Sequence, residues 1–450
     1  MAITEMEMEQ LTDLAEKKQF KRLKEILCEM NEVDIAEVMN ELPPERALVT
    51  FRLLPKDLGS EVFACLEIEE QQHIINSMED QELKTIIEDL AIDDAVDMVE
   101  ELPASVVKRI LKAATPATRK LINQYLQYPE NSAGSIMTAE YVALRPSMTV
   151  EESFAYIRKN GVDKETIYTC YVINPQRKLL GVVTLKDLLM NPYETKIEDI
   201  MDDNIIFSLT TDDQEEVAGV FNKYGLLALP VVDKENRLVG IVTVDDIVDV
   251  MEQEATEDFQ KMAAMAPSEK SYLKTSVFEL AKNRIPWLLI LMLSSTVSGQ
   301  ILNHYESAFV MIPLLVSFVP TLMDTGGNSG SQASTLIIRG MATGEIQLKD
   351  ILKVVWKELR VGILCGALLA VINFIRLIIM YPGNTMVCVT VVISMFFTVI
   401  LAKTLGVLLP MLAKAIHLDP ALMASPMLTT IVDACSMFIY FTLATRVLSL

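Results

Sequence analysis

Five segments of the chain, all beyond residue 284, are each long and apolar enough to cross a lipid bilayer. An α-helix needs about 20 mostly apolar residues to span the hydrocarbon core. The segments are residues 285–303, 308–339, 361–380, 386–412 and 421–450. The chain is therefore not a purely soluble globular protein, and we expect an all-α transmembrane domain with five helices over residues 271–450.

Charge divides the chain at the same place. Of its 61 acidic and 39 basic residues, 7 acidic and 9 basic ones lie from residue 285 onward, so residues 1–284 hold 54 acids and 30 bases. The excess of acids in residues 1–284 argues against nucleic acid as a partner, because phosphate binding needs basic surfaces. Cations are the natural partners of an acidic surface.

The expected orientation follows from the basic residues beside the spans. Lys282 and Arg284 precede the first span, several bases lie between the second and third, and Lys403 and Lys414 lie toward the end of the fourth. The positive-inside rule then predicts a multi-pass protein of the cell membrane with a cytoplasmic N-terminus and an extracellular C-terminus. The polar, acidic start of the chain lacks the features of a cleaved signal peptide.

Residues 1–127 have the pattern of an all-α domain. Apolar residues recur at helical spacing, as in Ile35, Val38, Met39 and Leu42. Helix breaks recur as well, in the motifs ELPPE, LLPKD and ELPAS, since proline is tolerated only in turns and first helical turns. We expect short helices stacked in pairs into a small superhelix.

An internal repeat follows in residues 128–251. Residues 171–189 align with residues 230–248 at a constant offset of 59, and each copy has the pattern strand, helix, strand, turn, strand, helix. The copies cover about residues 128–190 and 196–251, and together they predict an α/β unit. Residues 252–270 continue as an acidic helix that connects this unit to the membrane segments.

The repeat resembles a tandem cystathionine-β-synthase (CBS) pair, which is a ligand-sensing module. Both copies end in a G-h-h-T-x-x-D motif. In CBS pairs this Thr and Asp can contact an adenosine ribose, so the resemblance makes ATP a candidate ligand. The candidate nucleotide contacts are Thr184, Asp187, Thr243 and Asp246. The alternative, compatible with the first, is that Thr and Asp cap the last helix of each copy.

Two features inside the spans do not resemble lipid-facing helix. The second span contains the small and polar stretch DTGGNSGSQAST from Asp324 onward, and the fifth carries Asp433. A charge at that depth costs about 2.5–3.5 kcal/mol, so Asp433 should face water, an ion or an opposite charge. Arg376 and Lys403 are the candidate bases for a salt bridge. For the small residues the alternative role is tight helix packing.

The order of these parts, with the motifs PTLMDTGGNSGSQASTLIIRG and TTIVDACS, resembles the MgtE family of magnesium channels over essentially the whole chain. The resemblance implies a homodimer with one pore between its subunits, in which Mg²⁺ is both transported and regulatory. Two Asp433 carboxylates would face each other across the twofold axis. Oxygens around the hydrated ion are expected from Asn328, Gly326, Gly327, Gln332, Thr429 and Thr430.

In this family Mg²⁺ also binds between the cytosolic domains and closes the pore. The acidic excess gives a physical basis, because carboxylates brought together repel unless a cation bridges them. Gly225 stands where family members can carry an acidic residue. The candidate sensing residues are Asp93, Asp94, Asp97, Asp213, Glu215, Asp245, Asp246, Asp249, Glu254, Glu257 and Asp258.

Other functions have less support in the sequence. A CBS-controlled membrane receptor or a channel for another ion is the main alternative, and Mn²⁺ or Co²⁺ are further candidate substrates. The six cysteines and three histidines have no metal-ligand spacing. We find no nucleophile with a base at useful spacing and no P-loop, so we expect no enzyme activity.

Overall fold

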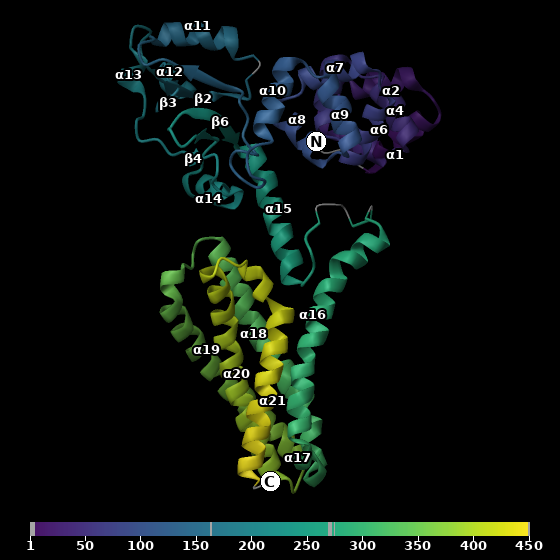
Figure 1. The fold of residues 1–450 in the computed structure, drawn as a ribbon, viewed down its shortest axis with the longest axis vertical. Coiled ribbons are helices and arrows are strands. Elements are labelled where there is room, and N and C mark those ends of the chain that lie inside the picture. Colours follow the sequence, from purple (N-terminus) through teal and green to yellow (C-terminus); the bar gives the residue numbers. More distant parts are fainter. Residues whose placement is uncertain (1–4, 163, 269–271, 274, 449–450) are drawn as a thin grey trace. The chain divides into compact units, whose positions relative to one another are not determined.

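The computed structural model describes residues 5–162, 164–268, 272–273 and 275–448. The chain divides into two compact units, residues 1–250 and residues 251–450. The first unit contains a helical part and an α/β part, and the second is helical (Figure 1). This agrees with the expected fold class.

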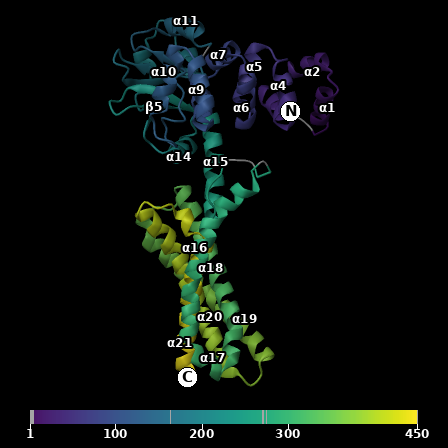
Figure 2. The ribbon, with the colours of Figure 1, turned by 45° about the vertical axis from the view of Figure 1, so that its right-hand side comes forward.

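The helical part of the first unit consists of ten short helices that stack in chain order (Figures 1 and 2). They are α1 (Glu5–Glu16), α2 (Phe20–Leu27), α3 (Glu32–Glu41), α4 (Pro44–Phe51), α5 (Lys56–Ala64), α6 (Ile68–Ser77), α7 (Asp80–Asp89), α8 (Ile92–Glu101), α9 (Ala104–Ala113) and α10 (Pro116–Tyr125).

Proline begins the helices at all three predicted breaks. Pro44 is the first residue of α4, and Pro55 and Pro103 are the N-caps of α5 and α9. At these positions the missing N–H of proline costs no intrahelical hydrogen bond. The motifs ELPPE, LLPKD and ELPAS therefore mark helix boundaries as expected.

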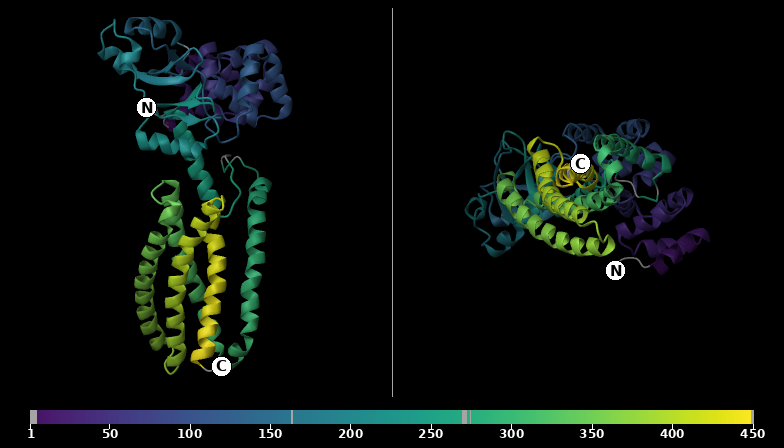
Figure 3. Two further views of the ribbon diagram at one scale, coloured as in Figure 1. Left: turned by 60° about the vertical axis from the view of Figure 1, so that its left-hand side comes forward. Right: turned by 90° about the horizontal axis from the view of Figure 1, so that it is seen from below.

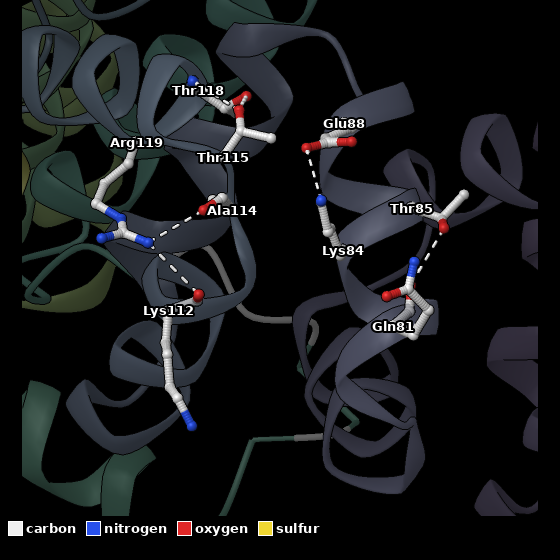
Figure 4. Close-up of polar contacts among 9 residues, drawn as sticks. All are labelled: Gln81, Lys84, Thr85, Glu88, Lys112, Ala114, Thr115, Thr118 and Arg119. Carbon is white, nitrogen blue, oxygen red and sulfur yellow. Dashed lines mark hydrogen bonds and ion pairs between the residues drawn. The ribbon is translucent and has the colours of Figure 1, made fainter.

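Side chains form hydrogen bonds with backbone groups at the ends of neighbouring helices, as Figure 4 shows for α9 and α10. The Arg119 guanidinium donates to the carbonyl oxygens of Ala114 at 3.1 Å and Lys112 at 3.4 Å, at the end of α9. The Thr118 N–H donates to Thr115 Oγ1 at 3.2 Å, at the start of α10. These bonds satisfy backbone groups that a helix end leaves without partners.

The α/β part contains two three-stranded sheets, ordered β1-β2-β3 and β4-β5-β6. In each sheet the first two strands are parallel and the last two antiparallel, which matches the predicted repeat. The elements are β1 (Tyr141–Leu144), α11 (Val150–Asn160), β2 (Thr166–Ile173), β3 (Leu179–Thr184), α12 (Leu185–Met190), α13 (Ile197–Ile200), β4 (Ser208–Leu209), α14 (Gln214–Tyr224), β5 (Ala228–Val232), β6 (Leu238–Thr243) and α15 (Val244–Met262).

The connecting helix is shorter than predicted. Helix α15 ends at Met262, whereas the sequence pattern predicted a helix to residue 270. Ala264 adopts a left-handed conformation with φ of 54°, and the N–H groups of Ala264 and Met265 bond back to Lys261 and Gln260. Such a turn ends a helix. Pro267 follows, as is common shortly after a helix C-terminus.

The second unit consists of long helices. Four of them among the described residues, α16, α19, α20 and α21, are long and apolar enough to cross a membrane. Figure 3 shows α19 and α20 packed side by side. The elements are α16 (Val277–His304), α17 (Glu306–Met311), η1 (Pro313–Phe318), α18 (Val319–Ala342), η2 (Leu348–Asp350), α19 (Ile351–Met380), α20 (Thr385–Ala415), η3 (Pro420–Met423) and α21 (Ser425–Val447).

The predicted second span is not one continuous helix. It is divided into α17, the 3₁₀ turn η1 and α18, with a non-helical Ile312 between the first two. Pro313 cannot donate the backbone hydrogen bond that would continue α17. Helix α18 is not among the four apolar helices, because the Gly, Ser and Asn residues of the DTGGNSGSQAST stretch lower its hydropathy.

Glycines allow the membrane-unit helices to approach closely. A Cβ on Gly406 of α20 would lie 2.5 Å from the carbonyl oxygen of Gly330 in α18. Between α19 and α20, a Cβ on Gly366 of α19 would lie 3.2 Å from the carbonyl oxygen of Phe396. Small residues at such contacts let backbones pack against each other without intervening side chains.

Candidate functional site

The small-residue stretch of α18 is helical and has two different sides. Gly326, Gly327 and Gly330 are buried against α20 and α21. A Cβ on Gly326 would lie 2.9 Å from Val432 Cγ1, and one on Gly327 would lie 2.9 Å from Thr429 Cγ2. Helix packing therefore explains the glycines, and it brings two predicted pore residues, Gly327 and Thr429, into contact.

The other side of α18 is polar and exposed. Asp324, Asn328 and Gln332 are spaced one helical turn apart and are all exposed in the single chain. The Asn328 side-chain amide donates to Asp324 Oδ1 at 3.0 Å. We call these three residues the polar edge of α18. Asn328 and Gln332 were predicted as site residues, whereas Asp324 was not.

Asp433 lies half-buried on α21, and the charge that acts on it is another acid. The carboxylate of Asp324 interacts with it as a like charge. Of the two bases predicted as candidate partners of Asp433, Lys403 forms an ion pair with Glu358 at 3.8 Å, and Arg376 is exposed. A salt bridge of Asp433 with either base is therefore absent from the described residues.

Both predicted threonines of α21 use their hydroxyl protons within the helix. The Thr429 hydroxyl donates to the carbonyl oxygen of Pro426 at 2.9 Å, and that of Thr430 to Met427 at 2.7 Å. A hydroxyl has one proton to donate and two lone pairs to accept with. Toward any other partner these oxygens therefore act as acceptors, which suits a cation or its bound water.

In the first unit, three predicted acids lie on one helix, α8. The surrounding protein raises the pKa of Asp94 and of Asp97 from the ordinary 3.8 to about 7, by desolvation first and then by neighbouring carboxylates. Burial also raises the pKa of Asp93, and the Asp245 charge acts in the same direction. These acids therefore experience a strongly anionic environment.

The neighbouring carboxylates come from the α/β part. Asp246, at the start of α15, interacts with Asp93, Asp94 and Asp97, and Asp245 interacts with Asp93. Two acids that the sequence analysis missed, Glu140 and Glu165, join the same electrostatic group; burial raises the pKa of Glu165 to about 7. Nothing in the sequence relates these two to α8, because their proximity depends on the tertiary fold.

A pocket of about 180 Å³ lies next to this group. Asp94, Asp97 and the buried Gln71 line it, and the Gln71 side-chain oxygen has no hydrogen-bond partner among the described atoms. Within the described part of the chain, however, no three His, Cys, Asp or Glu side chains are close enough together to form a metal site.

The remaining predicted sensing acids lie on elements other than α8. Asp213 is the N-cap of α14 and accepts from the Glu215 N–H at 2.9 Å, so both serve the helix start. Gly225 ends the same helix with φ of 62°, a conformation that explains glycine there. Asp249 and Glu254 follow along α15. Glu257 and Asp258 lie in the second unit, where Glu257 contacts Lys261 at 2.7 Å.

The four candidate nucleotide residues form matching hydrogen bonds in the two repeats. The Thr184 hydroxyl donates to Asp187 Oδ2 at 2.5 Å, and the Thr243 hydroxyl donates to Asp246 Oδ2 at 2.6 Å. Thr184 also accepts from the Asp187 N–H at 3.2 Å, which completes a capping box. The predicted capping role is therefore confirmed for the first copy.

Family comparisons cover most of the chain. Residues 319–443 match the MgtE divalent cation transporter model, residues 30–131 match the MgtE intracellular N domain, and residues 133–193 and 197–253 each match the CBS domain.

The chain is similar over nearly its whole length to two curated relatives. It is 36% identical to the magnesium transporter MgtE of Thermus thermophilus, covering 94% of each chain. It is 31% identical to the magnesium transporter MgtE of Bacillus subtilis, covering 93% of this chain and 92% of the relative.

Among solved structures, the cytosolic domain of the Mg²⁺ channel MgtE in complex with ATP is 38% identical to the matched part, with a TM-score of 0.51, and covers 54% of this chain and 99% of that one. The soluble part of a magnesium transporter is 28% identical, with a TM-score of 0.52 over 55% of this chain and 98% of that one. The chain belongs to the MgtE family.

Proposed function

We propose that this chain carries Mg²⁺ across the cell membrane as a homodimer, along a path lined by α18 and α21. The observation that carries the proposal is the pair of acids, Asp433 and Asp324, that interact with each other on two packed helices of the second unit, α21 and α18. Like charges at membrane depth are unfavourable unless a cation or water compensates them. Relatives named as magnesium transporters support the choice of cation.

The polar edge of α18 supports the homodimer. Asp324, Asn328 and Gln332 are exposed in the single chain, and a charged or amide side chain facing lipid is costly. A second copy related by a twofold axis would place the same edge of its own α18 opposite and enclose a polar path. In this arrangement α18 supplies the second of five crossings, with the N-terminus in the cytoplasm and the C-terminus outside.

The oxygen donors near Asp433 suit a hydrated ion. Mg²⁺ loses its water reluctantly and prefers six oxygen ligands, so it usually keeps several waters and contacts few carboxylates. The hydroxyl oxygens of Thr429 and Thr430 and the amide oxygens of Asn328 and Gln332 would accept hydrogen bonds from those waters. The carbonyl oxygens of Gly326 and Gly327 are further candidate acceptors. Mn²⁺ and Co²⁺ have similar ligand preferences and are candidate alternative substrates.

The acids of the first unit provide a mechanism for regulation by cytosolic Mg²⁺. Asp93, Asp94 and Asp97 repel Asp245 and Asp246 in the compact unit, and a divalent cation between them would stabilise that form. Loss of the cation would favour separation of the parts and release of α15. The CBS pair is the candidate site for ATP, because the related cytosolic domain was solved in complex with ATP.

The pore assignment is tested by measuring Mg²⁺ flux into liposomes that contain the purified chain. Asp433→Asn keeps the shape of the side chain and removes its charge. We expect flux to fall by about 10- to 100-fold, because a contact to a charged group contributes about 1.5–3 kcal/mol. Glu306→Gln, in the exposed first turn of α17, is the matched control and should transport normally.

Two results would contradict the proposal. Liposomes with the unchanged chain that take up no Mg²⁺ would reject Mg²⁺ transport, and they would favour the alternative of a CBS-controlled receptor. Asp433→Asn that transports at the same rate as Glu306→Gln would reject Asp433 as part of the path.

A further inference from the structure

One lysine, Lys261, forms an ion pair between the end of α15 and the segment before η3. Lys261 Nζ lies 2.7 Å from Glu257 Oε1 on its own helix and 2.7 Å from Asp419 Oδ2, next to η3. The Lys261 side chain is only 20% exposed. Its ammonium group therefore joins two carboxylates from different elements in a partly dry environment, where ion pairs are stronger than at an open surface.

Asp419 uses both of its oxygens in this arrangement. While Oδ2 pairs with Lys261, Oδ1 accepts a hydrogen bond from the Ala421 N–H at 2.8 Å. That bond caps η3, the turn that leads into α21 and hence toward Asp433. A displacement of Asp419 would therefore also move the start of α21, the helix that carries Asp433.

Apolar packing continues the same contact. Met262, the last residue of α15, packs against a small cluster formed by Ile338 of α18, Ala421 of η3 and Ala424, the N-cap of α21. The end of α15 thus contacts the last turns of α18 and the segment that leads into α21.

The charges at this contact are nearly balanced, and Lys261 provides much of the balance. Three acids, Glu257, Asp258 and Asp419, face two bases, Lys261 and Arg339. Burial and then the Asp419 charge raise the pKa of Asp258, so the acids repel one another despite the bases. Without the lysine charge, three carboxylates would remain with one base, and the docked position of α15 would be less stable.

We propose that the Lys261 ammonium group, through its ion pair with Asp419, holds the end of α15 docked on the segment that enters α21 without a bound metal. We call this ion pair the latch. The proposal rests on the transport function proposed above. It makes Lys261 a positioning residue that sets how much cytosolic Mg²⁺ is needed to close the pore. Part of the charge compensation that closure requires is then built into the chain.

Three variants test the latch. Lys261→Met keeps the apolar stem and removes the charge. Asp419→Asn removes the charge and keeps an oxygen that accepts from the Ala421 N–H. The double variant removes both partners. Lys353→Met is the matched control, because Lys353 pairs with Asp350 at 3.1 Å but is 85% exposed.

The first readout is Mg²⁺ flux at varied Mg²⁺ on the cytosolic side. We expect the concentration that half-closes the pore to rise about two- to fivefold in each single variant, the range expected for the loss of an ion pair near the protein surface. The double variant should show no further rise, because both changes break the same contact. Lys353→Met should be unchanged. A lower closing concentration, no shift, or additive effects would overturn the latch.

The second readout does not need transport. Cysteines placed at Met262 and Ala424 would form a disulfide when α15 is docked. In Mg²⁺-free buffer, we expect Lys261→Met to slow this cross-linking about two- to fivefold. An unchanged cross-linking rate would refute the latch even if the chain carried no Mg²⁺, so failure of the latch and failure of the transport proposal can be told apart.

Discussion

The contact between Gly406 of α20 and Gly330 of α18 allows a quantitative test of the bundle packing. In Gly406→Ala, the new Cβ would lie 2.5 Å from the Gly330 carbonyl oxygen and 3.0 Å from Ala333 Cβ, whereas ordinary contacts begin near 3.4 Å. The obstacle on α18 is backbone, which cannot rotate away, so the two helices must separate by roughly 0.9 Å or tilt.

The expected cost is the difference of two effects. Overpacking a tight contact costs about 1–3 kcal/mol, while replacing glycine by alanine inside a helix gains up to about 1 kcal/mol. Gly299→Ala in α16 isolates the second effect, because nothing lies within 4 Å of a Cβ built there. Relative to Gly299→Ala, we therefore expect Gly406→Ala to be less stable by about 1–3 kcal/mol.

Tryptophan fluorescence reports this difference, since both tryptophans, Trp287 and Trp356, lie in the membrane unit on α16 and α19. On heating in detergent, the midpoint for Gly406→Ala should be lower than for Gly299→Ala, by roughly 2–4 °C for each kcal/mol in a unit of this size. Equal midpoints, or a higher midpoint for Gly406→Ala, would refute the close approach of α18 and α20.

Three further predictions follow from side chains in both units. Because the pKa values of Asp94 and Asp97 are raised to about 7, the Mg²⁺-free chain should become more stable as pH falls from 7 toward 4. Thermal melts that are flat over this range, or a pH dependence that is unchanged when both are changed to Asn, would contradict this. Thr184→Val should destabilise the CBS pair by about 1 kcal/mol in urea unfolding, while Thr184→Ser should not, because only valine removes the cap. Glu358→Gln should cost about 3–5 kcal/mol by leaving the buried Lys403 uncompensated, and the additional change Lys403→Met should recover much of that loss in thermal melts; a double variant as unstable as the single one would argue against the ion pair.

Local patterns were enough to predict most of the fold. Proline positions marked the ends of α3 and α8 and the starts of α4, α5 and α9, because proline fixes its own backbone angle φ and lacks an N–H wherever it occurs. The constant offset of 59 predicted two equivalent sheets, since repeated sequence implies repeated structure. The length of α15 was overestimated because residues 263–266, around the turn at Ala264, are alanine and methionine, which favour helix.

The candidate site was less predictable, because it depends on which faces of different helices meet. The apolar span around Asp433 showed that a charge there is costly. The sequence did not relate Asp433 to Asp324, which lies on another helix. The glycines of α18 were ambiguous for a similar reason. Their burial against α20 and α21 and the exposure of the adjacent Asn328 become distinct only when neighbouring helices are present.

The acids of this chain differ in what compensates them, and this difference orders their proposed roles. Glu257 and Asp419 share Lys261, so their contact needs no free ion. Asp94, Asp97 and Asp246 have other acids as their main charged neighbours, so their proximity depends on protons or a cation from the cytosol. Near pH 7 Asp94 and Asp97 are partly protonated, and a cation that binds them must displace protons. Proton release on addition of Mg²⁺ at pH 7, lost when both are changed to Asn, therefore separates ion binding at these acids from general screening of an acidic surface.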